Sequence, residues 1–202
     1  MSSSTSRESK PNPSEARSRG RRIALAILAV CAAPVIAAWL AYFVWPLESR
    51  ENYGELLEPR LLPDPELRLA DGGSLRLSAL RGKWVMLQVD GGACDAYCQQ
   101  KLLHMRQVRL AQGRNSDRVE RVWLVDDDVP LDRAQLSAQE GAHVARASGS
   151  RILIEFPPGS GIHDHIYVVD PLGNLMLRFP RDPDPNLIRK DLSRLLRVSR
   201  IG

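Results

Sequence analysis

The stretch of sequence that decides the fold is WVMLQVDGGACDAYC, residues 84–98. Its first part, Trp84 to Val89, is a nearly continuous apolar run, which is typical of a central strand buried on both faces. A loop of small residues follows. From about Asp95 to Gln112, apolar residues then recur at three- and four-residue spacing, which predicts a helix. The chain therefore places Cys94 and Cys98 where a buried strand passes into a helix.

The segments on either side alternate between strand and helix patterns. Before the junction, Leu67–Leu69 and Leu75–Leu77 flank an Asp-Gly-Gly turn and predict a hairpin. The elements predicted after it are a strand over 119–125, a helix over 131–147, a short strand over 152–154, a hairpin of 166–169 with 175–179, and a helix over 185–198. This order predicts an α/β fold, a small sandwich of the thioredoxin-like kind.

The charge is unevenly distributed along the chain. The net charge is +4, and residues 1–22 alone hold six basic and two acidic side chains, which also gives +4. The remaining 22 basic and 22 acidic residues therefore cancel. A neutral domain lacks the basic surface that phosphate backbones require, so the sequence predicts no nucleic-acid partner.

A predicted membrane span follows the basic segment. Ile23 to Trp45 is 23 residues without a charged side chain. As a helix it would be about 34 Å long, and a hydrocarbon core is about 30 Å thick. The run is longer than the apolar region of a cleaved signal peptide and ends in bulky aromatic residues. The arginines before it predict a single-pass protein of the bacterial inner membrane, with a cytoplasmic N-terminus and a periplasmic C-terminal domain.

These patterns predict four parts. Residues 1–22, rich in Ser, Pro and Arg, are expected to form a disordered cytoplasmic tail, and 23–45 the transmembrane helix. Residues 46–65, with several prolines and mixed charges, are expected to form an extended linker. The thioredoxin-like periplasmic domain is expected to cover 66–202.

Cys94 and Cys98 carry the candidate chemistry. The N-terminus of a helix offers unpaired N–H groups and a partial positive charge, which stabilise a thiolate. If the helix begins at or before Cys94, both sulfurs lie on one face with Cα atoms about 6 Å apart, within the range of a disulfide. The same geometry suits a soft metal such as Cu(I). A purely structural disulfide and a pair of small buried side chains are the two remaining interpretations.

The chain resembles the Sco (SenC) family of membrane-anchored, thioredoxin-fold copper proteins that help to metallate cytochrome c oxidase. The resemblance covers most of residues 66–202. The segments that carry it are LRGKW at 80–84, the Cys-x-x-x-Cys junction, VWLVD at 122–126 and YVVDPLG at 167–173 with a histidine ahead of it. It looks most similar to the divergent branch of single-span proteobacterial proteins.

The resemblance implies a copper site made of Cys94, Cys98 and either His163 or His165. His163 is favoured because the family histidine lies in the loop a few residues before the strand. Sco proteins usually have proline after each cysteine, where this chain has Asp95 and Gln99.

Other charged and titratable residues lie near or outside this set. A carboxylate at position 95 would raise the pKa of the thiols. His104 and His143 fall within predicted helices and are expected to be ordinary surface residues. The acidic run at 126–128 has two interpretations: it faces the site from the end of the neighbouring strand, or, as the favoured expectation, it is a solvated turn that caps the next helix.

Three functions are compatible with these features. The first is a copper-handling assembly factor without turnover, which passes Cu(I) to a cytochrome c oxidase subunit or works with other assembly factors. The second is a periplasmic thiol-disulfide oxidoreductase that acts on the cysteines of the oxidase, in which Cys94 attacks a partner disulfide and Cys98 resolves the mixed disulfide. The third is an interaction protein of the same assembly whose site has degenerated.

Overall fold

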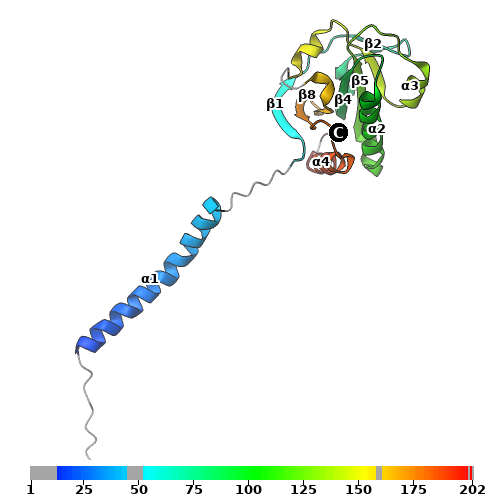
Figure 1. Ribbon diagram of the computed structural model, residues 1–202. Coiled ribbons are helices and arrows are strands. Elements are labelled where there is room, and N and C mark those ends of the chain that lie inside the picture. The colour runs from blue at the N-terminus through cyan, green and yellow to red at the C-terminus, as the bar shows by residue number, and fades with distance from the viewer. Residues whose placement is uncertain (1–12, 45–51, 158–160, 200, 202) are drawn as a thin grey trace, which may run out of the picture. The chain divides into compact units, whose positions relative to one another are not determined.

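The computed structural model describes residues 13–44, 52–157, 161–199 and 201. The chain divides into two compact units, Met1–Ser49 and Arg50–Gly202. The first unit holds one helix, α1 (Pro13–Val44) (Figure 1). Within it, Arg21–Leu40 has a mean hydropathy of 2.5 and is, among the described residues, the one helical stretch long and apolar enough to cross a membrane.

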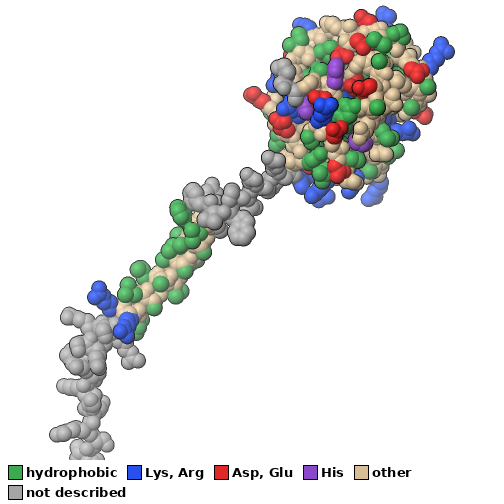
Figure 2. Space-filling model, in the orientation of Figure 1, with side chains coloured by type: hydrophobic (Ala, Val, Ile, Leu, Met, Phe, Trp, Pro, Cys, Tyr) green, Lys and Arg blue, Asp and Glu red, His purple; other side chains and the backbone are tan. Residues whose placement is uncertain are grey.

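Helix α1 begins before the predicted membrane span. The helix begins at Pro13, so it includes residues 13–22 of the segment expected to be disordered. The rest of that segment, and Trp45 at the end of the predicted span, lie outside the described residues. Figure 2 shows apolar side chains along this helix, whereas charged side chains of both signs are interspersed over the visible face of the second unit.

The second unit is built on one mixed sheet of eight strands in the order β1-β8-β7-β4-β5-β6-β2-β3. The strands are β1 (Glu55–Leu61), β2 (Leu67–Leu69), β3 (Ser74–Leu75), β4 (Trp84–Asp90), β5 (Val119–Val125), β6 (His143–Arg146), β7 (Tyr167–Val169) and β8 (Asn174–Arg178). The α-helices are α2 (Ala96–Leu110), α3 (Arg133–Ala138) and α4 (Pro185–Val198). Short 3-10 helices cover Leu77–Leu80 (η1), Gly113–Arg118 (η2), Arg151–Glu155 (η3) and Ile162–Asp164 (η4).

Strand β4 lies at the centre of the sheet, parallel to β5 and antiparallel to β7. Every residue of β4 is buried, which confirms the prediction from its apolar run. One core cluster packs residues of α2 and α4 against one face of the sheet, and a second cluster covers the other face. The predicted thioredoxin-like α/β fold is therefore present, with α2 leaving the carboxyl end of the most deeply buried strand (Figure 1).

Most predicted elements are confirmed, and two are wrong. The helix expected over 131–147 is the six-residue α3, which ends at Ala138, followed by strand β6. Gly141, with φ of 74°, turns the chain between them, so that Val144 and Ala145 enter the sheet. The strand expected over 152–154 is the 3-10 helix η3, whose first turn is capped by the side chain of Ser150.

The segment expected to be a linker also contains regular structure. Strand β1 lies within 46–65 and pairs antiparallel with β8 at the edge of the sheet. Its residues are mostly exposed, so the buried alternation that signals a strand is absent from its sequence. The backbone N–H of Gly54, just before β1, donates to the carboxylate of Asp191 on α4 at 2.8 Å.

Candidate functional site

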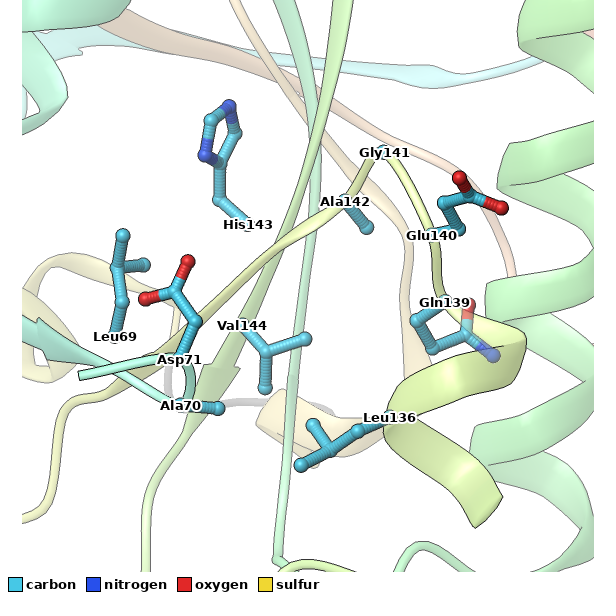
Figure 3. Close-up of a pocket in the computed structure, with 10 residues that line it drawn as sticks. All are labelled: Leu69, Ala70, Asp71, Leu136, Gln139, Glu140, Gly141, Ala142, His143 and Val144. Carbon is cyan, nitrogen blue, oxygen red and sulfur yellow. The ribbon is translucent and has the colours of Figure 1, made fainter. Parts of the chain in front are cut away.

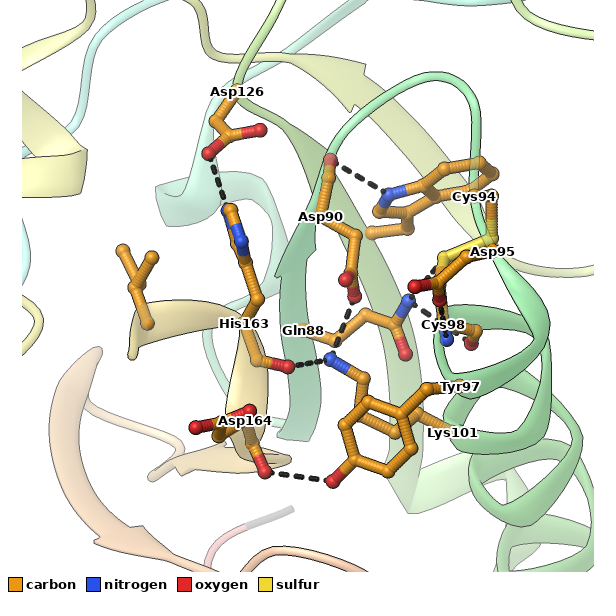
Figure 4. A network of polar contacts seen from close by, with 12 residues as sticks. Gln88, Asp90, Cys94, Asp95, Tyr97, Cys98, Lys101, Asp126, His163 and Asp164 are labelled. Atoms are coloured by element: carbon orange, nitrogen blue, oxygen red, sulfur yellow. Dashed lines mark hydrogen bonds and ion pairs between the residues drawn. A yellow bond between two sulfur atoms is a disulfide. The ribbon is translucent and has the colours of Figure 1, made fainter. Parts of the chain in front are cut away.

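The candidate site lies at the carboxyl end of β4, where a short loop leads into α2 (Figure 4). Asp127, which follows β5, accepts a hydrogen bond from the backbone N–H of Gly92 at 2.8 Å. A side chain on Gly92 would collide with the carbonyl of Val129, so this position requires glycine. The loop is thus held against the end of the neighbouring strand.

Cys94 and Cys98 form a disulfide with a Cα–Cα distance of 5.1 Å. Cys94 precedes the helix in the left-handed region, with φ of 39°, a conformation that non-glycine residues rarely adopt. This turn brings its sulfur back over the first turn of α2. Both cysteines are buried, but Cys94 borders a surface groove between α2 and α3 that Cys98 does not reach. Of the two cysteines, Cys94 is therefore the one that borders the surface, with 4% of the residue exposed.

Asp95 and Gln88 both contact Cys98 directly. Asp95 is the N-cap of α2, and its carboxylate accepts a hydrogen bond from the N–H of Cys98 at 2.9 Å. This carboxylate offsets the positive end of the helix dipole, which would otherwise favour a thiolate. Gln88, fully buried on β4, directs its amide N–H at the sulfur of Cys98, at 3.4 Å.

A buried ion pair lies beside the disulfide. The ammonium of Lys101, one turn after Cys98 on α2, is 2.7 Å from the carboxylate of Asp90 at the end of β4. Burial raises the pKa of Asp90 to about 6, although the charge of Lys101 opposes the rise. Burial also lowers the pKa of Lys101, and here Asp90 opposes the shift. Both groups are therefore desolvated and depend on each other for their charged forms.

Helix α2 also holds the loop that contains the histidines. Lys101 donates a second hydrogen bond to the carbonyl of His163, and the hydroxyl of Tyr97 donates to the carbonyl of Asp164 at 2.9 Å. Figure 4 shows that the Lys101 ammonium and Asp90 lie between the His163 ring and the disulfide. The loop is therefore fixed to the cysteine-bearing helix through its backbone.

The two histidines are bonded elsewhere. Nε2 of His163, on a half-exposed side chain, lies 2.6 Å from the carboxylate of Asp126, and Nδ1 of the buried His165 lies 2.6 Å from the carbonyl of Phe179. Among the residues that the structure describes, no group of three His, Cys, Asp or Glu side chains could hold a metal ion. In the disulfide form, the cysteines are thus together and the histidines are apart from them.

The acidic run after β5 follows the less favoured of its two predicted roles. Asp126 pairs with His163, and Asp127 holds the glycine loop. The helix that follows is capped by another residue, Asp132, whose side chain accepts from the N–H of Ala134. The run therefore belongs to the site and is not the cap of α3.

The other two histidines lie away from the cysteine pair. His104 lies on α2 and is partly buried, which lowers its pKa. His143 lies on β6, 3.5 Å from the carboxylate of Glu120, and lines a pocket of about 210 Å³ between β6, the loop after β2 and α3 (Figure 3). The predicted helical position of His143 was wrong because the predicted helix was too long.

Gln88, Asp90 and Lys101 belong to the site but were not predicted from the sequence. Gln88 could have been noticed as the one uncharged polar residue in an apolar strand. Lys101 stands three residues after Cys98 and four before Met105, so it falls on the buried stripe of α2. A lysine at such a position requires a buried partner.

A mixed sheet with a cysteine pair at the start of the helix after its central strand defines a thioredoxin-like protein. The chain belongs to the family described as "Transmembrane-like, thioredoxin-like, C-terminal domain", whose model matches residues 84–199. A comparison with curated proteins finds no match.

Solved structures share the fold. Copper-bound ScoI from Bradyrhizobium japonicum is 17% identical, with a TM-score of 0.52, over 68% of this chain and 98% of that one. Copper-bound yeast Sco1 is 14% identical, with a TM-score of 0.55, over 71% and 96%. A putative protein disulfide isomerase from Bacteroides thetaiotaomicron is 19% identical, with a TM-score of 0.51, over 71% and 88%.

Proposed function

We propose that the C-terminal domain exchanges disulfides with the cysteines of a partner protein. The observation that carries this proposal is the Cys94–Cys98 disulfide at the start of α2, in which Cys94 lines a surface groove and the sulfur of Cys98 contacts the buried Gln88. This asymmetry suits a pair in which one sulfur meets the partner and the other acts from within.

The exchange begins with the reduced domain. The Cys94 thiolate attacks one sulfur of a partner disulfide, and a bond forms between these two sulfurs while the partner's other sulfur leaves as a thiolate. Cys98 then loses its proton and attacks the sulfur of Cys94. The Cys94–Cys98 bond forms, and the partner's second sulfur leaves as a thiolate. Two electrons have passed to the partner, which takes up two protons, and a dithiol donor returns the domain to its reduced form.

The buried groups assist the second step. The amide N–H of Gln88 stabilises the thiolate that Cys98 must become before it attacks. Asp95 acts in the opposite direction, because its negative charge at the helix N-terminus raises the pKa of the nearby thiols. The pair is thus balanced between a donor that favours the thiolate and a carboxylate that opposes it.

Copper handling is the second candidate function, with Cu(I) as cargo. It is supported by the soft donors of the reduced Cys94 and Cys98 and by the likeness in fold to copper-bound Sco structures. We propose His163 as the third ligand, because its side chain is half exposed and its loop is bonded to α2. His165 fits this role less well, because it is buried and its ring is held by Phe179.

We further propose that α1 anchors the protein in the bacterial inner membrane with the domain in the periplasm. The arginines before the apolar stretch support this orientation. The partner of this protein would be a cytochrome c oxidase subunit or another assembly factor of that oxidase, as the motifs shared with Sco proteins imply.

The test uses single-turnover reaction of the reduced chain with oxidised glutathione. The expected result is loss of two thiols per chain with release of reduced glutathione, with Cys31→Ser as a matched control that leaves the reaction unchanged. Cys98→Ser should stop at the mixed disulfide with Cys94. Persistence of both thiols in the presence of the oxidant would refute the proposal.

A further inference from the structure

The groove beside Cys94 runs between α2 and α3 and has a volume of about 360 Å³. In a mixed disulfide the partner's sulfur lies about 2 Å from that of Cys94. The residues on either side of the partner's cysteine must then lie on the surface next to Cys94. The residues that line the groove therefore indicate which kind of partner segment can bind there.

We propose that this groove binds an extended, cysteine-bearing segment of the partner that carries an apolar residue beside the cysteine and an acidic residue about five positions away. The inference rests on the proposed thiol-disulfide exchange and specifies its substrate. Three properties of the lining support it: an apolar wall, a pair of buried acceptors and a cation.

The apolar wall is formed by α2. Leu102 lies at the buried side of the groove, and Leu103 beside it is 51% exposed. Covering the exposed part of a leucine side chain with an apolar side chain contributes on the order of 1 kcal/mol. An apolar residue next to the partner's cysteine would cover it.

The acceptors come from α3 and the residue that follows it. The side-chain oxygens of Gln135 and Gln139 are buried and have no hydrogen-bond partner among the described residues. The orientation of Gln135 is set by its amide N–H groups, which lie 3.4 Å from the carbonyls of Ala93 and Cys94. Buried acceptors without partners are unfavourable, and the backbone N–H groups of an extended segment would satisfy them once the two glutamine side chains turn toward the groove.

The cation is Arg106, at the far end of the groove. Its guanidinium lies 3.4 Å from the carbonyl of Ala138, and none of the described carboxylates pairs with it. Helix α2 rises by about 15 Å over the ten residues from Ala96 to Arg106, and an extended chain spans this distance in about five residues. A carboxylate about five positions from the partner's cysteine would therefore reach this arginine.

The test uses the full-length chain in detergent with Cys31→Ser and Cys98→Ser, so that Cys94 is the one thiol left. The probe is a peptide with a central cysteine bound as a mixed disulfide to thionitrobenzoate, a neighbouring leucine, and glutamate about five positions away on each side. Cys94 attacks the peptide sulfur, the bond to thionitrobenzoate breaks, and its coloured anion leaves. A second peptide carries lysine in place of both glutamates.

The glutamate peptide is expected to react about fivefold faster than the lysine peptide. This ratio corresponds to the free energy of one exposed ion pair. Arg106→Glu should invert this order, whereas Arg189→Glu, a charge reversal on the exposed side of α4, should preserve it. Equal rates, a faster lysine peptide, or a preference that survives Arg106→Glu would overturn the proposal for the groove. If Cys94 reacts neither with the peptides nor with the small symmetrical disulfide of thionitrobenzoate, the proposed exchange itself fails.

Discussion

Replacing Lys101 with methionine should destabilise the domain in a way that depends on pH. The lysine is fully buried, and its ammonium lies 2.7 Å from the carboxylate of Asp90. Methionine has a similar length and no charge, so the variant keeps most of the packing but leaves Asp90 without its cation. Removing one partner of a buried ion pair costs about 3–5 kcal/mol when the other stays charged.

The pH dependence follows from the raised pKa of Asp90, about 6 in the folded protein and 3.8 as the ordinary value. Because the folded state binds the proton more tightly, stability is greatest below the ordinary pKa and falls as the pH rises toward 6. In the native protein this loss ends near pH 6. In Lys101→Met the pKa is higher still, so the loss continues at about 1.4 kcal/mol per pH unit.

The variant should therefore lose about 3 kcal/mol relative to the native domain between about pH 6 and pH 8. Urea denaturation of the 50–202 unit, which holds both core clusters, measures this difference. Lys83→Met is the matched control, because Lys83 pairs with Glu120 but its own side chain is 44% exposed. This variant should lose less than about 1 kcal/mol of unfolding free energy. Adding Asp90→Asn to Lys101→Met should remove the pH dependence.

A loss that stays constant between about pH 6 and pH 8 would refute this reasoning, since Asp90 would then not be the group left unpaired. Equal stability of the variant and the native domain at about pH 8 would refute it as well.

Three further predictions concern the cysteines, the histidines and the membrane. Asp95→Asn keeps the helix cap but removes a negative charge near the thiols, so the pKa of Cys94 in the reduced domain should fall, as measured by the pH dependence of alkylation. An unchanged pKa would contradict this. If the reduced domain binds Cu(I), His163→Ala should weaken binding in a competition titration and His165→Ala should not, and the reverse order would exclude His163 as ligand. A reporter that works only in the periplasm should be active when fused after Gly202, and activity of a cytoplasmic reporter there would reverse the orientation.

The sequence predicted the elements whose side chains alternate or repeat clearly. The run in β4 and the stripe on α4 indicated the correct strand and helix because each buries a regular set of apolar side chains. Strand β1 was missed because it is an exposed edge strand. The helix predicted at α3 was too long because Val144 and Ala145 continue an apolar pattern but belong to the sheet.

The candidate site was predictable only in part. The position of Cys94 and Cys98 follows from the strand-to-helix junction, which local pattern reveals. The pairing of Asp90 with Lys101 and of Asp126 with His163 depends on contacts between residues distant in sequence. No local pattern indicates which of several charged residues will meet, so these contacts required the three-dimensional fold.

The most direct test of the proposed disulfide exchange is a redox titration of the Cys94–Cys98 pair in the folded chain. The protein is equilibrated in buffers of defined dithiothreitol ratio, and free thiols are alkylated and counted by mass. We expect two thiols to appear together, in a single reversible two-electron transition, while the domain remains folded. A bond that opens only when the domain unfolds would mark a purely structural disulfide and would contradict the proposed exchange.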